Sequence, residues 1–107
     1  MEHRRTRRFT LNLPLSVVRT GVEQTTLAGH TKNISSTGVL FTTENEPSVE
    51  GAIEYVISLS EGEGRPVNLR CLGKVVRLER AANGRHGGKQ AYHVAATLER
   101  YEFVRAQ

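Results

Sequence analysis

Several residue types are scarce in this chain of 107 residues, and each scarcity excludes a class of structure or function. The single cysteine excludes an intramolecular disulfide and favours a reducing compartment, so we expect a cytoplasmic protein. Aspartate is absent, so any acidic chemistry must come from glutamate. No apolar run approaches the roughly 18 residues of a membrane-spanning helix, and the N-terminus lacks a signal-peptide pattern. We therefore expect one soluble domain with no membrane insertion.

The positive charge is concentrated at the N-terminus. The formal net charge is +4, and residues 1–8 carry four arginines against Glu2, which leaves only +1 for the rest of the chain. A surface that binds a nucleic-acid polymer normally carries a basic stripe across the whole fold. The charge pattern therefore favours a small anionic ligand, and no nucleic acid is expected as a partner.

The apolar residues alternate with polar ones, which is typical of half-buried strands. In the first predicted strand, residues 9–17, one face carries Phe9, Leu11, Leu13, Leu15 and Val17. Further strands are expected at about Thr25–Lys32, Gly38–Thr43, Ala52–Leu59, Val67–Leu78 and Gln90–Leu98. Gly73 interrupts the fifth of these six strands, which favours a β-bulge there. The C-terminal segment LERYEFVRAQ is compatible with the start of a short helix.

Six short strands with hairpin-like connections and no long helix predict an all-β fold. We expect a six-stranded antiparallel β-barrel that forms a single domain over residues 9–107. A closed barrel also removes the exposed edges that an open sheet would leave.

The first polar motif is Arg4-Arg5-Thr6-Arg7-Arg8, directly before the first predicted strand. Arg4 and Arg8 are four residues apart, so they share a side in an extended or a helical segment. If Phe9 faces the core, Arg8 and Arg4 face outward. Guanidinium groups bind phosphates and the guanine edge, and they stack on purines. Taken alone, the segment is equally compatible with a solvated tail or with a clamp for an anion.

The second polar motif is NISSTG, residues 33–38, which joins two predicted strands. Asparagine, serine and glycine are common turn residues, so a plain hairpin turn also accounts for it when it is taken alone.

Together the two motifs resemble those of the PilZ domain, the bacterial receptor for cyclic di-GMP. In that family an RxxxR segment and a [D/N]xSxxG segment flank the ligand. Arg4 and Arg8 match the first pattern, and Asn33, Ser35 and Gly38 match the second. The later segment GKVVR, residues 73–77, is similar to a G-x-V-V-R strand of the family. The resemblance covers about residues 3–98.

This resemblance implies a receptor or adaptor domain that is not an enzyme. It converts binding of cyclic di-GMP into an altered interaction with an effector protein, whose identity and downstream process the sequence does not specify. Residues 1–8 are then a flexible, arginine-rich clamp that folds over the ligand. The implied ligand contacts are Arg4, Arg5, Arg8, Asn33, Ser35 and Gly38, with Arg77 as a further contact.

Asn33 departs from the commoner aspartate of the family motif. A carboxylate can accept two hydrogen bonds from the N1 and N2 groups of guanine, whereas an amide has only one acceptor oxygen. We therefore expect binding to survive at reduced affinity.

Two other functions fit parts of the sequence. A PilZ-fold adaptor that has lost nucleotide binding would usually lack the arginine pair. A barrel for single-stranded nucleic acid would need exposed aromatic platforms, and the chain has only three Phe, three Tyr and no Trp.

Catalytic and metal sites are not expected. The four histidines, His3, His30, His86 and His93, have no metal-ligand spacing. Cys71 shares a face with Val67, Leu69 and Val75, which favours a core position over a nucleophile. The scattered glutamates form no evident catalytic pair, so neither a catalytic residue nor a cofactor is assigned.

Overall fold

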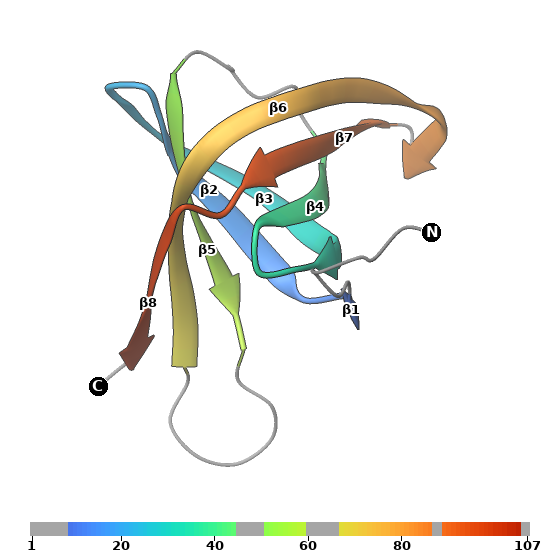
Figure 1. The fold of residues 1–107 in the computed structure, drawn as a ribbon. Helices are drawn as coiled ribbons and strands as arrows, with labels where there is room; N and C mark the ends of the chain where they lie inside the picture. The colour runs from blue at the N-terminus through green and yellow to red at the C-terminus, as the bar shows by residue number, and fades with distance from the viewer. Residues whose placement is uncertain (1–8, 45–50, 60–66, 87–88, 106–107) are drawn as a thin grey trace, which may run out of the picture.

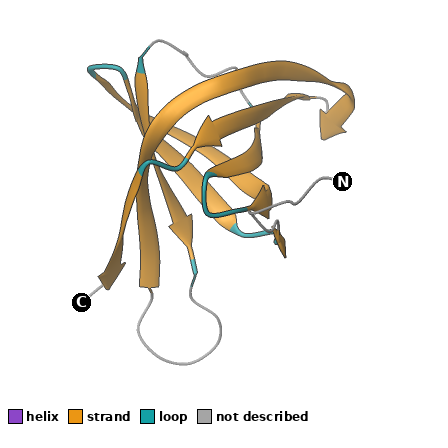
Figure 2. Ribbon diagram, in the orientation of Figure 1, coloured by secondary structure: helices purple, strands orange, loops and turns teal. Residues whose placement is uncertain are grey.

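The computed structural model describes residues 9–44, 51–59, 67–86 and 89–105, which form eight strands and no helix (Figures 1 and 2). The strands are β1 (Phe9–Thr10), β2 (Pro14–Thr20), β3 (Glu23–Ile34), β4 (Gly38–Thr43), β5 (Ala52–Ser58), β6 (Val67–His86), β7 (Lys89–Thr97) and β8 (Arg100–Arg105). The predicted all-β class is confirmed. With no helix in these ranges, none of them contains a candidate for a membrane-spanning helix.

Six of the strands close into a barrel. Their hydrogen-bonded order is β3-β2-β5-β6-β7-β4, and β4 pairs back with β3 to complete the circle (Figure 1). Every pairing is antiparallel. The six-stranded antiparallel barrel predicted from the sequence is therefore confirmed, and β1 and β8 are two extra strands that pair with β3 and β6.

The inward-facing residues of the six strands form one apolar core. Phe41 and Tyr55 are fully buried at its centre, with ring centroids 5.7 Å apart. Cys71 is also fully buried, and burial raises the pKa of its thiol to about 12. The thiol therefore stays protonated and packs as a small apolar group, as the sequence indicated.

The first predicted strand differs from the structure in its N-terminal half. Leu11–Leu13 separate β1 from β2, and Phe9 is 54% exposed, so the prediction that Phe9 faces the core was wrong. The buried hydroxyl of Thr31 stabilises this break, since it donates to the carbonyl of Leu11 and accepts from the N–H of Leu13 at 2.9 Å. Before the break, β1 pairs with the part of β3 that extends past the end of β2, and there more than half of the Phe9 side chain remains exposed.

The C-terminal helix suggested by the sequence was wrong. Residues 100–105 form β8, in which Leu72 is opposite Arg100 and Val67 is opposite Arg105. The physical reason is the length of β6, which runs past the end of β7 and exposes backbone groups on that edge. Pairing with β8 satisfies these groups, which a helix would leave without hydrogen-bond partners.

The β-bulge predicted at Gly73 lies three residues later, at Val76, where the register shifts between Val75 and Arg77. Gly73 itself keeps a regular register with Ile53. A Cβ atom at Gly73 would overlap the carbonyl oxygen of Thr97, so glycine is needed for the close approach of the end of β7.

We expect Gly73→Ala to destabilise the barrel by about 2 kcal/mol, because the added methyl group must displace the backbone of β7. Lys74→Ala is the matched control, since its exposed side chain lies on the next residue of the same strand. Urea unfolding of both variants measures the difference. Equal stability of the two variants would contradict the steric role of Gly73.

Candidate ligand-binding cleft

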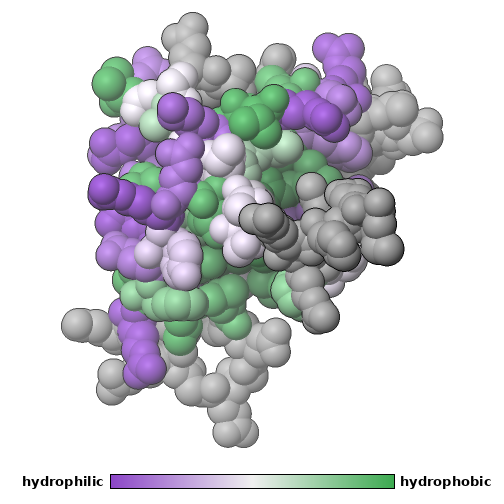
Figure 3. Space-filling view, viewed as in Figure 1, coloured by the Kyte–Doolittle hydropathy of each residue, from purple (hydrophilic) through white to green (hydrophobic). Residues whose placement is uncertain are grey.

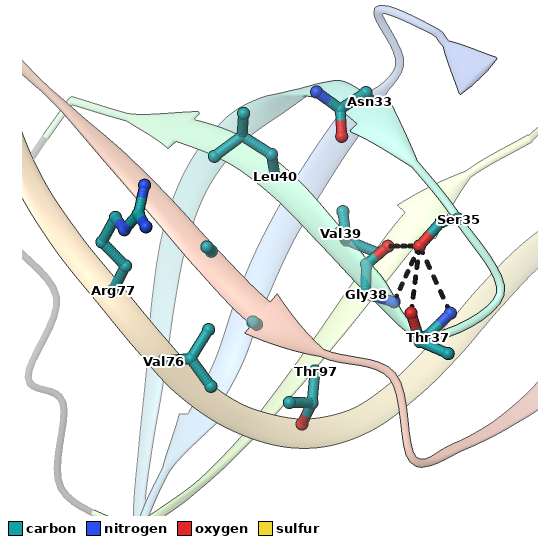
Figure 4. Close-up of a pocket in the computed structure, with 11 residues that line it drawn as sticks. Asn33, Ser35, Thr37, Gly38, Val39, Leu40, Val76, Arg77 and Thr97 are labelled. Carbon is teal, nitrogen blue, oxygen red and sulfur yellow. Dashed lines mark hydrogen bonds between the residues drawn. The ribbon is translucent and has the colours of Figure 1, made fainter. Parts of the chain in front are cut away.

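A cleft with a volume of about 440 Å³ lies on the outside of the barrel, across β4 and β7 (Figure 4). Its lining consists of Asn33, Ser35, Thr37, Gly38, Val39, Leu40, Val76, Arg77, Ala95, Ala96 and Thr97. The structure thus brings together four of the residues singled out in the sequence, although they come from segments more than thirty residues apart.

One row of side chains crosses the cleft from strand to strand. Asn33 on β3 is opposite Leu40 on β4. Leu40 is opposite Ala95 on β7, and Ala95 is opposite Arg77 on β6. Directly opposite residues share one face of an antiparallel sheet. With strands about 4.8 Å apart, the backbone positions of Asn33 and Arg77 are separated by roughly 14 Å, with an apolar floor between these two polar ends.

A β-bulge in β3 turns Asn33 toward the cleft. Thr31 is buried and opposite Phe41, so strict alternation would also place Asn33 inside the barrel. The register shifts between Thr31 and Asn33, and Lys32 is the extra residue. This single insertion reverses the alternation and places Asn33 on the outer face.

A second β-bulge does the same for Arg77 in β6. Val75 is opposite the buried Ala96, so strict alternation would direct Arg77 inward. The shift between Val75 and Arg77 makes Val76 the extra residue and moves Arg77 to the outer face. Val76 is 65% exposed and adds an apolar side chain to the cleft.

The hydroxyl of Ser35 organises the turn at one end of the cleft (Figure 4). Its oxygen lies 3.3 Å from the backbone nitrogen of Thr37 and 3.2 Å from that of Gly38, both of which can donate to it. The hydroxyl can itself donate to the carbonyl of Gly38, at 3.2 Å. Ser35 therefore already has partners within the protein, and its contact with a ligand stays a prediction.

Glycine is favoured at position 38 because there is little space for a side chain, and not because the backbone has an unusual conformation. Its φ is not positive, unlike that of Gly21 and Gly51. A Cβ atom at Gly38 would lie 3.0 Å from the carbonyl oxygen of Ala96, which is tighter than ordinary contact. The close approach of β4 and β7 is therefore the structural reason for glycine at this end of the cleft.

Two hydrogen bonds fix the end of β7 beside this turn. The N–H of Leu98 donates to the carbonyl of Thr37 at 2.9 Å. From inside the barrel, the hydroxyl of Tyr55 donates to the carbonyl of Thr97 at 3.0 Å. Burial raises the pKa of Tyr55 above its usual value, so its hydroxyl remains a donor.

Arg77 is the one charged side chain among the described residues that line the cleft. Its side chain is 70% exposed, and its Nε lies 4.0 Å from a carboxylate oxygen of Glu79. An exposed pair at this distance contributes little free energy. The guanidinium group of Arg77 is therefore available to an anion in the cleft.

Arg4, Arg5 and Arg8 lie outside the described residues. The chain that follows them is placed, because Phe9 is opposite Ile34 and Thr10 is opposite Asn33. The arginine segment is thus joined to the barrel directly beside a residue that lines the cleft.

Seven of the lining residues were not predicted from the sequence: Thr37, Val39, Leu40, Val76, Ala95, Ala96 and Thr97. The position of Leu40 could have been found, because alternation with the apolar residues on either side of it places it on the outer face. The exposure of Val76 depends on the bulge in β6 and has no comparable sequence pattern.

A profile of the PilZ domain matches residues 2–101, nearly the whole chain. This match confirms the resemblance inferred from the two motifs. None of the curated proteins and none of the solved structures matches the chain.

We expect Ser35→Ala to loosen the turn that ends the cleft. Loss of the hydroxyl removes an acceptor for two backbone N–H groups, at a cost of about 1 kcal/mol. Hydrogen exchange at the amides of Thr37 and Gly38 should accelerate by about fivefold, since 1.4 kcal/mol corresponds to a factor of ten. Ser36→Ala is the matched control, because Ser36 is exposed. Equal exchange rates in the two variants would contradict this role of Ser35.

Proposed function

The chain belongs to the PilZ domain family, and we propose that it is a receptor for cyclic di-GMP. PilZ domains are non-catalytic receptor domains that typically bind this second messenger. The observation that carries the proposal for this chain is the row from Asn33 to Arg77, which combines an apolar floor with a polar group at each end.

The chemistry of the row suits a purine nucleotide. Leu40, Ala95 and Val76 offer apolar surface on which a guanine base can lie. The carbonyl oxygen of the Asn33 amide can accept from the guanine N1 or N2 group. Arg77 can bind a phosphate or the O6 and N7 atoms of guanine. The cleft thus supplies recognition of the base and part of the charge that the ligand requires.

The remaining positive charge comes, in this proposal, from the N-terminal arginines. Cyclic di-GMP carries two phosphates, and Arg77 alone cannot neutralise both. Arg4, Arg5 and Arg8 precede the strand that pairs beside Asn33, so the segment can reach the ligand from that side. Each charge-assisted hydrogen bond contributes about 1.5–3 kcal/mol, and less at an exposed site.

Ordering of residues 1–8 over the ligand is the proposed output. A segment rich in like charges is flexible without an anion and folds when one is bound. The surface beside the cleft then differs between the free and bound states. An effector protein in the cytoplasm can distinguish the two states by this surface.

The two other candidate functions receive less support. An adaptor without nucleotide binding would not need Arg77 exposed in a cleft that also contains the other motif residues. A site for single-stranded nucleic acid relies on aromatic stacking, and no aromatic residue occurs among the described residues that line the cleft.

We expect Arg8→Ala to lower the affinity for cyclic di-GMP at least tenfold while the barrel stays folded. The loss of one charge-assisted hydrogen bond, about 1.5 kcal/mol, corresponds to roughly a factor of ten. Calorimetric titration measures the affinity, and circular dichroism checks the fold. GTP and a short oligonucleotide are titrated in parallel, and both should bind far more weakly than cyclic di-GMP.

Arg80→Ala is the control for this experiment, since Arg80 is an exposed arginine of β6 outside the cleft lining. It removes the same charge and should leave the affinity within about twofold, because distant exposed charges are screened by salt. An unchanged affinity in Arg8→Ala, or an equal loss in both variants, would reject the clamp. Absence of any binding by the wild-type protein would favour the adaptor without nucleotide binding.

We expect Asn33→Asp to bind cyclic di-GMP about two- to tenfold more tightly, a gain of roughly 0.5–1.5 kcal/mol. The carboxylate offers two acceptors of similar size, and charged acceptors form stronger hydrogen bonds than neutral ones. Its repulsion of the ligand phosphates is screened beyond about 8 Å at physiological salt. Titration at two salt concentrations separates these effects. Weaker binding at both would show that Asn33 does not face a guanine edge.

A further inference from the structure

Strand β8 has one paired edge and one open edge. Its first edge pairs with residues 67–72 of β6, and none of the described residues pairs with its other edge (Figure 1). The six residues of β8 include neither proline nor glycine, and all six are exposed. A strand edge of this kind is a template for pairing with another chain.

The face of β8 that continues the barrel interior carries two exposed aromatic rings. Tyr101 is opposite Cys71 and Phe103 is opposite Leu69, so both rings lie on the core side of the sheet. They are nevertheless 60% and 65% exposed, and they pack edge to face with centroids 6.1 Å apart. Figure 3 shows hydrophobic surface exposed across the lower part of the molecule, where β8 runs beside β6.

The opposite face of β8 carries a charged side chain that contacts β6. Arg70 of β6 lies 3.3 Å from a carboxylate oxygen of Glu102 and also contacts the buried carboxylate of Glu54 on β5. Glu54 is contacted in turn by Arg19 of β2 at 3.5 Å. The open edge of β8 thus belongs to a strand whose other edge is hydrogen-bonded to β6 of the barrel wall.

We propose that β8 is a dimerisation edge, which pairs antiparallel with β8 of a second copy of this chain. The two-fold axis passes through Phe103, so each Phe103 lies opposite its copy. Tyr101 then lies opposite Arg105 of the second copy, and the same pair recurs on the other side of the axis. Paired aromatic rings and a cation beside an aromatic ring both stabilise such a strand pair.

The charges of β8 disfavour the neighbouring register that is centred on Glu102. An axis through Glu102 would place the two Glu102 carboxylates directly opposite each other, which destabilises a strand pair. In the register centred on Phe103, Glu102 faces Val104 of the second copy, so no like charges are opposite. This self-complementarity is the reason to identify the partner as a second copy rather than as a strand of another protein.

The dimer leaves the cleft open. None of the described residues that line the cleft belongs to β8. A six-residue strand also buries less surface than the roughly 1,600 Å² of a standard stable interface. We therefore expect association to depend on protein concentration and to occur without ligand.

Sedimentation velocity of the full chain from micromolar to millimolar concentration tests the proposal. The wild-type mass should rise from the 11.9 kDa monomer to twice that value. Phe103→Lys should weaken association at least tenfold, because two ammonium groups then meet at the axis. Val22→Lys is the control, since Val22 is 95% exposed at the β2–β3 turn, and it should associate like wild type.

Cysteine cross-linking tests the register. The native Cys71 is fully buried, so a new exposed cysteine is the reactive one. Opposite Cβ atoms in a strand pair are about 4.5–5.5 Å apart, close enough for a disulfide to form with slight adjustment. Phe103→Cys should therefore give a covalent dimer on mild oxidation, while Glu102→Cys should remain largely monomeric.

Cross-linking of Glu102→Cys without that of Phe103→Cys would overturn the proposed register. A wild-type protein that stays monomeric at millimolar concentration would overturn the dimer.

Discussion

The alternation of side chains across a closed barrel is the constraint on which the structure depends. Six strands direct every second residue into one core, so a residue reaches the outer surface only at the right position in its strand. Asn33 and Arg77 would both face inward under strict alternation. One extra residue in each strand, Lys32 and Val76, reverses this direction and assembles the cleft.

The ends of the barrel differ from its wall in their strand pairing. Strands β3 and β6 extend beyond the ends of their neighbours β2 and β7, and each pairs there with a short strand that is not one of the six barrel strands. At β1 this arrangement joins the arginine segment to the cleft. At β8 it leaves an open edge with two exposed aromatic rings, on a surface that the cleft does not share. The proposed sites for ligand and second copy are therefore separate.

The proposed role of residues 1–8 follows from the incomplete charge of the cleft. Arg77 is the only cation among its described lining residues, whereas the proposed ligand carries two phosphates. The barrel thus supplies a rigid apolar floor, braced by Tyr55 and by the turn that Ser35 organises. The missing charge lies in residues 1–8, so binding and ordering of this segment are coupled in the proposal.

The sequence by itself determined the strand class, the approximate positions of six strands and the residues of both motifs. These properties are local, since period-two alternation and turn residues act over a few positions. Only the tertiary structure decided the break before β2, the two bulges, the strand at Arg100–Arg105 and the use of Gly73 for close packing. Each of these features depends on which backbone or side-chain groups of another strand lie opposite. The register between distant strands cannot be predicted from any one segment of the sequence.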